Sequence, residues 1–162
     1  MSEHRHSEPP LTDEALEAWL DRTILRRPPN ILDTLVAYTR HDNPEIRSTA
    51  AYGLGEVDDE RAVETLLKVV SEDNDENVRD EALRALDTYR DPRILDALIR
   101  EVGREKRSRP PRQVVARQLR HYPSDRTVAA LRELLNDEDE FVSSDAADSL
   151  RLVLAELESR RS

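Results

Sequence analysis

The stretch Ile46-Arg-Ser-Thr-Ala-Ala-Tyr-Gly-Leu-Gly55 recurs further along the chain as Val78-Arg-Asp-Glu-Ala-Leu-Arg-Ala-Leu-Asp87. Ala50 and Leu54 of this stretch align with Ala82 and Leu86. The same two positions are occupied further along by Val115 and Leu119 and then by Ala146 and Leu150. A second segment recurs between these copies, as Ile31–Leu35, Ala62–Leu66, Ile94–Leu98 and Thr127–Leu131. Self-similarity with a period of roughly 20–50 residues indicates stacked structural units.

The apolar residues within each unit are spaced as on one side of a helix. Each unit is therefore predicted to be a helical hairpin, in which Asp59, Asp91 and Ser124 cap the second helix and Thr12 caps the first helix of the chain. Helices are expected near residues 12–25, 29–41, 44–55, 59–71, 75–88, 92–103, 110–121, 124–136 and 139–159.

The predicted fold class is all-α, a right-handed α-solenoid of about four stacked hairpins plus a terminal capping helix. One domain spans residues 12–160, and residues 1–11 form a disordered tail. The outer side of the last helix, with Arg151, Glu156 and Glu158, is expected to be the polar cap that an open stack needs.

Two details of the hairpins are also predicted. Gly53 and Gly55 lie at the end of a first helix, where glycine can stop a helix in the left-handed conformation. Tyr89 and Tyr122 align at the turn between helices, where we expect each ring to pack between hairpins while its hydroxyl stays in water.

The repeat resembles the HEAT-like family, in particular the short repeats first recognised in phycobilisome lyases. The residues that carry the resemblance are Asp73, Val78-Arg79, Ala82, Ala85-Leu86 and Asp91-Pro92-Arg93. The resemblance covers about residues 12–158. It implies an open surface for protein partners, as in adaptors, assembly factors, inhibitors and lyase subunits.

Composition excludes several classes of protein. The 162 residues include 35 acidic and 25 basic side chains, a net charge of −10, and no cysteine, so neither a disulfide nor a thiolate metal site can form. No apolar run comes near the length of about 20 residues that a membrane-spanning helix needs, and no secretory signal is recognisable, which predicts a cytoplasmic protein. Only two of the cations are lysine, and both a halophilic host and a GC-rich genome would explain that bias.

The sequence contains none of the common catalytic motifs. The chain has no nucleophile elbow, no glycine-rich phosphate loop and no H-E-x-x-H pair, and His4 and His6 are better explained by a flexible tail than by metal binding. Asp73-x-Asp75-x-Asn77 begins like a calcium loop, but Val78 stands where glycine must turn the chain. We therefore expect no enzymatic activity, no cofactor and no metal site.

The first predicted binding surface lies on the second helices of the hairpins. Asp33, Glu64 and Asp96 occupy equivalent outward positions and would form an acidic track for a basic segment, with Lys68 nearby. The alternative is an ordinary solvated face in an acidic chain.

The second predicted surface is an arginine-rich patch at residues 100–126, where nine basic side chains stand against three acidic ones. Its predicted binding residues are Arg100, Arg107, Arg109, Arg112, Arg117 and Arg120. They would contact an anionic partner, or they would pair inside the molecule with the acidic connections of neighbouring units.

The sequence therefore predicts a monomeric, non-enzymatic protein-interaction module that uses both surfaces. Two alternatives are a subunit or chaperone of a phycobilin-type lyase, suggested by the resemblance, and a binder of nucleic-acid backbone. Sequence-specific nucleic-acid readout is disfavoured by the acidic pI and the few aromatic residues.

Overall fold

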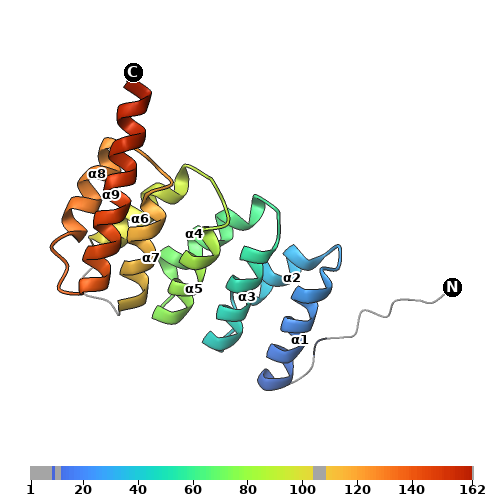
Figure 1. The fold of residues 1–162 in the computed structure, drawn as a ribbon. Coiled ribbons are helices and arrows are strands. Elements are labelled where there is room, and N and C mark those ends of the chain that lie inside the picture. The colour runs from blue at the N-terminus through green and yellow to red at the C-terminus, as the bar shows by residue number, and fades with distance from the viewer. Residues whose placement is uncertain (1–8, 10–11, 104–108, 162) are drawn as a thin grey trace.

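The structure, a computed structural model, describes residues 9, 12–103 and 109–161, and these fold into nine α-helices without a strand (Figure 1). The helices are α1 (Asp13–Arg26), α2 (Ile31–Tyr38), α3 (Pro44–Glu56), α4 (Arg61–Glu72), α5 (Glu76–Leu86), α6 (Arg93–Val102), α7 (Arg109–Leu119), α8 (Asp125–Leu134) and α9 (Glu140–Arg161). The all-α solenoid predicted from the repeats is confirmed. The predicted tail, apart from Pro9, lies outside the described residues.

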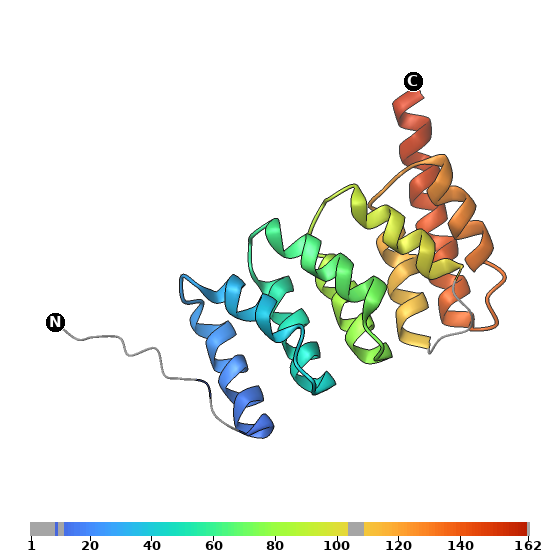
Figure 2. The ribbon, with the colours of Figure 1, turned by 180° about the vertical axis from the view of Figure 1, so that it is seen from behind.

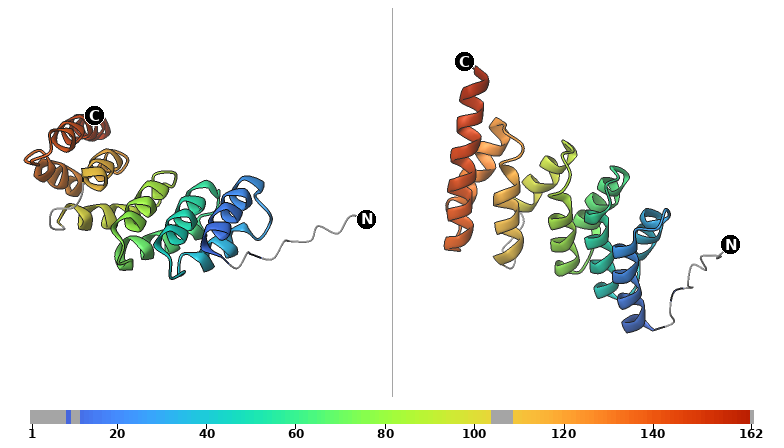
Figure 3. Two further views of the ribbon diagram at one scale, coloured as in Figure 1. Left: turned by 90° about the horizontal axis from the view of Figure 1, so that it is seen from below. Right: turned by 45° about the vertical axis from the view of Figure 1, so that its right-hand side comes forward.

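The helices form two layers. The odd-numbered helices stand side by side in one layer, and α2, α4, α6 and α8 form the other, which faces the viewer in Figure 2. The stack changes direction at α7, so that α7–α9 lie at an angle to α1–α6 (Figure 3). None of the described helices combines the length and apolarity needed to cross a membrane.

The interior runs between the layers along the whole stack. Every hairpin contributes at least one fully buried leucine from each layer. These include Leu20, Leu54, Leu86 and Leu119 in the odd layer and Leu35, Leu66, Leu98 and Leu131 in the even layer. Because each buried leucine contributes about 1.5–3 kcal/mol, the repeated apolar positions supply much of the stability. No hairpin could bury these residues without its neighbours.

Polar residues set the helix starts largely as expected. The side chains of Asp59 and Asp91 accept hydrogen bonds from the backbone N–H groups two residues later, and Ser124 accepts one from Thr127 N at 3.1 Å. Asp75 does the same for α5. Thr12 occupies the N-cap position of α1 as predicted, but its side chain makes no capping hydrogen bond.

Gly55 allows two odd helices to approach closely. No glycine among the described residues has a positive φ, and α3 continues through both Gly53 and Gly55, so the predicted helix-stopping role is wrong. A β-carbon on Gly55 would lie 2.9 Å from both Cα and Cβ of Ala85 in α5. The glycine is therefore required by the contact between α3 and α5.

A Gly55→Ala variant is expected to lower the free energy of unfolding by about 1–3 kcal/mol, because the new methyl group meets backbone that cannot turn away. Gly53→Ala is the matched control, since its methyl group would meet the side chains of Ile24 and Leu35, which can rotate, and no backbone. Urea titration of both variants measures the difference. A more stable Gly55→Ala protein, as helix propensity alone would give, would contradict the close-approach argument.

The Tyr89 hydroxyl is buried, contrary to the prediction that it stays in water. Its side chain lies in the core at 8% exposure, and the hydroxyl donates to the carbonyl oxygens of Leu54, at 2.5 Å, and Val57. Both acceptors belong to the end of α3, so Tyr89 ties the α5–α6 turn to the preceding hairpin. Burial above all, with the nearby charges of Asp58 and Asp59, raises the pKa of Tyr89 to about 12.

Candidate protein-binding surfaces

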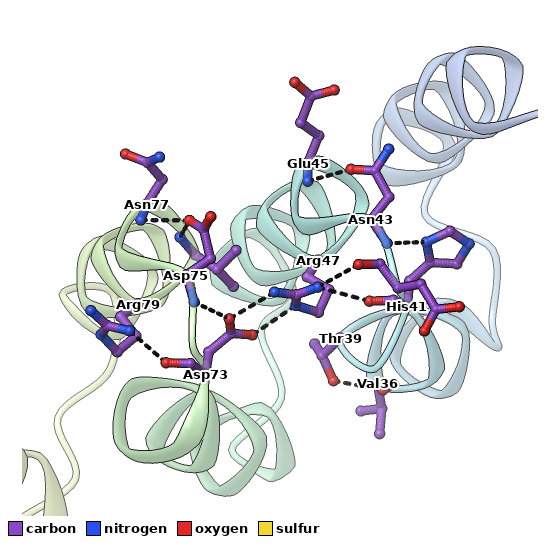
Figure 4. A network of polar contacts seen from close by, with 12 residues as sticks. Val36, Thr39, His41, Asn43, Glu45, Arg47, Asp73, Asp75, Asn77 and Arg79 are labelled. Carbon is purple, nitrogen blue, oxygen red and sulfur yellow. Dashed lines mark hydrogen bonds and ion pairs between the residues drawn. The ribbon is translucent and has the colours of Figure 1, made fainter.

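One arginine of the repeat pattern holds a hairpin closed. Arg47 of α3 donates two hydrogen bonds to the Asp73 carboxylate, from Nε at 2.8 Å and from Nη2 at 2.9 Å, and its Nη1 donates to the carbonyl oxygens of His41 and Asp42 (Figure 4). Asp73 follows α4, so this bidentate pair joins the two helices of one hairpin. The Asp73 carboxylate also accepts from the backbone N–H of Asp75 at 2.9 Å.

The electrostatics of this pair follow from its geometry. Burial alone would raise the pKa of the Asp73 carboxyl, but the hydrogen bonds from Arg47 and from the Asp75 backbone outweigh it and hold this pKa below its usual value. The hydrogen bonds with Asp73 in turn raise the pKa of Arg47. Both groups are charged at neutral pH and their bonding capacity is used within the hairpin, so neither is available to a ligand.

Arg112 occupies the position equivalent to Arg47 and closes its own hairpin in the same way. It forms an ion pair with Asp137, whose side chain is only 2% exposed, after α8. The expectation that Arg112 faces outward is therefore wrong, and for this residue the intramolecular alternative holds. Arg117 is also engaged, with its Nε 3.4 Å from Asp145 of α9, although half of its side chain remains exposed.

The remaining predicted arginines do not form one patch. Arg100 lies in α6 of the even layer and donates to the carbonyl oxygen of Asp96, whereas Arg117 and Arg120 lie in and just after α7 of the odd layer. Arg107 and the side chain of Arg109 lie outside the described residues. The arginines that stand close together along the sequence are thus distributed over two layers of the fold.

A cationic groove of about 290 Å³ lies between α5 and α7. Its lining residues are Arg84, Asp87, Val114, Arg117, Gln118 and Arg120. Arg84 was not predicted as a binding residue, because it lies outside the arginine-rich stretch and meets Arg117 and Arg120 only when α5 and α7 pack side by side.

The predicted acidic track lies on the even-helix face, which we define as the outer surface of α2, α4, α6 and α8. Asp33, Glu64 and Asp96 are all exposed there, on three successive even helices. Ala129 holds the equivalent place on α8, so the series of carboxylates ends at α6.

The carboxylates on this face alternate with arginines that the sequence analysis missed. Arg126, at the start of α8, lies 2.8 Å from the Asp96 carboxylate. Arg61 lies at the start of α4. Its pKa is raised mainly by a hydrogen bond to Asp59, and also by the charge of Asp33 at longer range.

Arg93 at the start of α6 repeats this arrangement. Its pKa is raised mainly by a hydrogen bond to Asp91, and also by the charge of Glu64 at longer range. We call the six residues Asp33, Arg61, Glu64, Arg93, Asp96 and Arg126 the charge row. The even-helix face therefore carries charges of both signs, and the predicted track is not purely acidic. The sequence signal for the arginines was the same repeat period that revealed the helices.

A groove of about 340 Å³ between α2 and α4 adjoins the charge row. It is lined by Val36, Thr39, Arg40, Arg61, Glu64, Thr65, Lys68, Val69, Glu72 and Asp73. Lys68 Nζ lies 3.8 Å from Glu72, and both side chains are more than half exposed, so this pair contributes little stability and can exchange partners.

Sequence comparison agrees with this architecture. A family model described as HEAT repeats matches residues 32–109, which include the α3–α4 and α5–α6 hairpins. Residues 32–109 of the chain are HEAT repeats. No curated protein matches it in sequence.

The HEAT stack also matches a solved structure, titled the complex of CpcE and CpcF of phycocyanin lyase from Nostoc sp. PCC7120, with a TM-score of 0.70 and 20% sequence identity. The match covers 96% of this chain and 70% of the other. At this identity the likeness concerns the fold. A HEAT stack of this kind is generally a scaffold with an extended surface for proteins.

Proposed function

We propose that this chain is a cytoplasmic, non-enzymatic protein-interaction module that holds a protein partner on its even-helix face. The observation that carries the proposal is the charge row, in which exposed carboxylates and guanidinium groups alternate across four successive even helices. Exposed pairs of this kind contribute little to the stability of the fold itself. They are suited to selecting a partner whose charges alternate in the complementary order.

The groove between α2 and α4 supports the same surface. It places the apolar side chains of Val36 and Val69 beside the charged end of Lys68, as a docking site for one partner side chain requires. Arg117 and Arg120, in the groove between α5 and α7, are proposed as a separate contact for an acidic segment. Arg112 is left out of the binding set, because it closes its own hairpin.

The test is quantitative capture of partners from the native host on the tagged chain, followed by mass spectrometry. Reversal of two row carboxylates, Glu64→Lys with Asp96→Lys, is expected to reduce recovery of the specific partner at least about tenfold, since like charges across an interface are unfavourable. Glu14→Lys is the matched control, because Glu14 is exposed on α1 in the odd layer. Equal recovery by all three proteins would remove the even-helix face from the proposal.

A lyase subunit is the second candidate, supported by the likeness to the solved CpcE–CpcF complex of phycocyanin lyase. It requires that the partner be a second lyase subunit or a bilin-carrying protein. The same capture experiment distinguishes the two candidates, because a partner without any bilin connection disfavours the lyase. A nucleic-acid backbone partner is disfavoured because the described arginines of residues 100–126 are divided between two layers and partly paired.

A further inference from the structure

An apolar groove lies on the last helix of the stack. It has a volume of about 470 Å³ and is lined by Leu135 after α8 and by Ala147, Leu150, Arg151, Leu154, Ala155 and Glu158 of α9. Leu135 and Leu154 are each 38% exposed. The side of α9 predicted as a polar cap therefore carries an apolar groove beside Arg151 and Glu158, and a neighbouring helix can pack on it.

The position of the groove defines the kind of neighbour that fits. The groove residues of α9 recur every three or four positions from Ala147 to Glu158, so they form a stripe about three turns long on one side of the helix. A helix that packs along this stripe must present a short apolar stripe of its own and charges complementary to Arg151 and Glu158.

The α9 sequence itself meets both requirements. When a two-fold axis crosses α9 between Leu154 and Ala155, the α9 of a second copy runs antiparallel, and Leu154 of each copy meets Ala155 of the other. Arg151 and Glu158 lie equally far from this axis on its two sides, so Arg151 of one copy stands beside Glu158 of the other. The charges therefore match twice across a self-complementary contact.

We propose that the groove on α9 is a homodimer interface in which the α9 of a second copy packs antiparallel along the same groove. Within one chain, Arg151 pairs with Asp148, at 2.8 Å, and both side chains are mostly exposed. This pair can persist while Arg151 also meets Glu158 of the second copy. The proposal departs from the monomer expected from the sequence and does not depend on the even-helix face.

Sedimentation equilibrium of the full chain between about 1 and 100 μM tests the proposal. The wild-type chain is expected to approach twice its mass of 18.6 kDa as concentration rises. Leu154→Glu is expected to abolish the increase, whereas Leu152→Glu, 52% exposed but outside the groove, leaves it intact. Wild-type protein that keeps the mass of a single chain, or a dimer lost with Leu152→Glu and kept with Leu154→Glu, overturns the proposal.

Charge exchange tests the register directly and does not depend on the stability of a leucine variant. Arg151→Glu and Glu158→Arg are each expected to be monomeric alone, because each places like charges opposite one another twice. An equimolar mixture of the two variants restores both opposite-charge pairs and is expected to form a heterodimer. A mixture that remains monomeric while the wild type dimerises contradicts this register, and dimers of either single variant do so as well.

Discussion

An Asp73→Ala variant is expected to lose about 3 kcal/mol of unfolding free energy, because it leaves the nearly buried Arg47 guanidinium without its carboxylate. The Arg47 and Asp73 side chains are 16% and 7% exposed, and two hydrogen bonds between them disappear together. The backbone N–H of Asp75 loses its acceptor as well. Urea titration followed by circular dichroism gives the difference from the wild type.

The control is Asp59→Ala, which removes another carboxylate–arginine pair whose partner, Arg61, is 73% exposed. This variant is expected to lose clearly less stability than Asp73→Ala, because water screens the exposed pair and the main loss is the hydrogen bond that caps α4. Equal losses for the two variants would show that the Arg47 pair does not hold the hairpin together.

Acid pH is expected to reduce the stability difference between Asp73→Ala and the wild type. Because the pKa of Asp73 is lowered in the fold, its contribution is present above the ordinary value of 3.8 and is lost as pH falls through the lowered value. The same direction holds for Asp59. Below these values the Asp73→Ala protein should approach the stability of the wild type, and a difference that stayed constant down to the acid limit would contradict this assignment.

The hairpins could be predicted because their determinants are local. The spacing of Ala82 and Leu86, and the capping residues Asp91 and Ser124, each act within one or two helical turns, and the period of the repeat reveals that the pattern recurs. Stacking follows once every hairpin has an apolar side to bury. These steps needed no knowledge of which distant residues meet.

The binding surfaces were harder to predict because charges pair across the repeat. The arginines of residues 100–126 look like one patch along the chain, yet α6 and α7 belong to different layers, and Arg112 finds its partner in Asp137, beyond the whole of α8. One signal for this was present, since Arg47 and Asp73 stand at the equivalent positions of an earlier hairpin. A carboxylate stands at nearly the same separation in both cases, 26 residues after Arg47 and 25 residues after Arg112.

The residues that make close contacts between repeats could be recognised as structural, but their contacts could not be predicted. Gly55 and Tyr89 were both recognised as structural residues, but the helix-stopping and water-exposed roles assigned to them considered each hairpin alone. In the structure, Gly55 lies against Ala85 of the next hairpin, which leaves no room for a side chain. The Tyr89 hydroxyl donates to the carbonyl oxygens of Leu54 and Val57 in the previous hairpin. Stacking converts residues at the ends of helices into interior ones.

A Tyr89→Phe variant is therefore expected to lower the free energy of unfolding by about 1–3 kcal/mol, the cost of leaving buried acceptors without their donor. The change keeps the ring and removes only the hydroxyl, which joins the α5–α6 turn to two carbonyl oxygens of the α3 end. Tyr122→Phe is the matched control, because Tyr122 aligns with Tyr89 and packs against the core, but its hydroxyl makes no hydrogen bond within the described residues.

Alkaline unfolding distinguishes loss of the hydroxyl from loss of packing. Since the pKa of Tyr89 is raised from 10.0 to about 12, its contribution is complete below pH 10 and is lost as pH rises toward 12, where the folded protein must give up a proton that the unfolded chain has already lost. The gap between wild type and Tyr89→Phe should therefore narrow across this interval. A gap that persists unchanged to pH 12 would mean that the hydroxyl is not the group that joins the two hairpins.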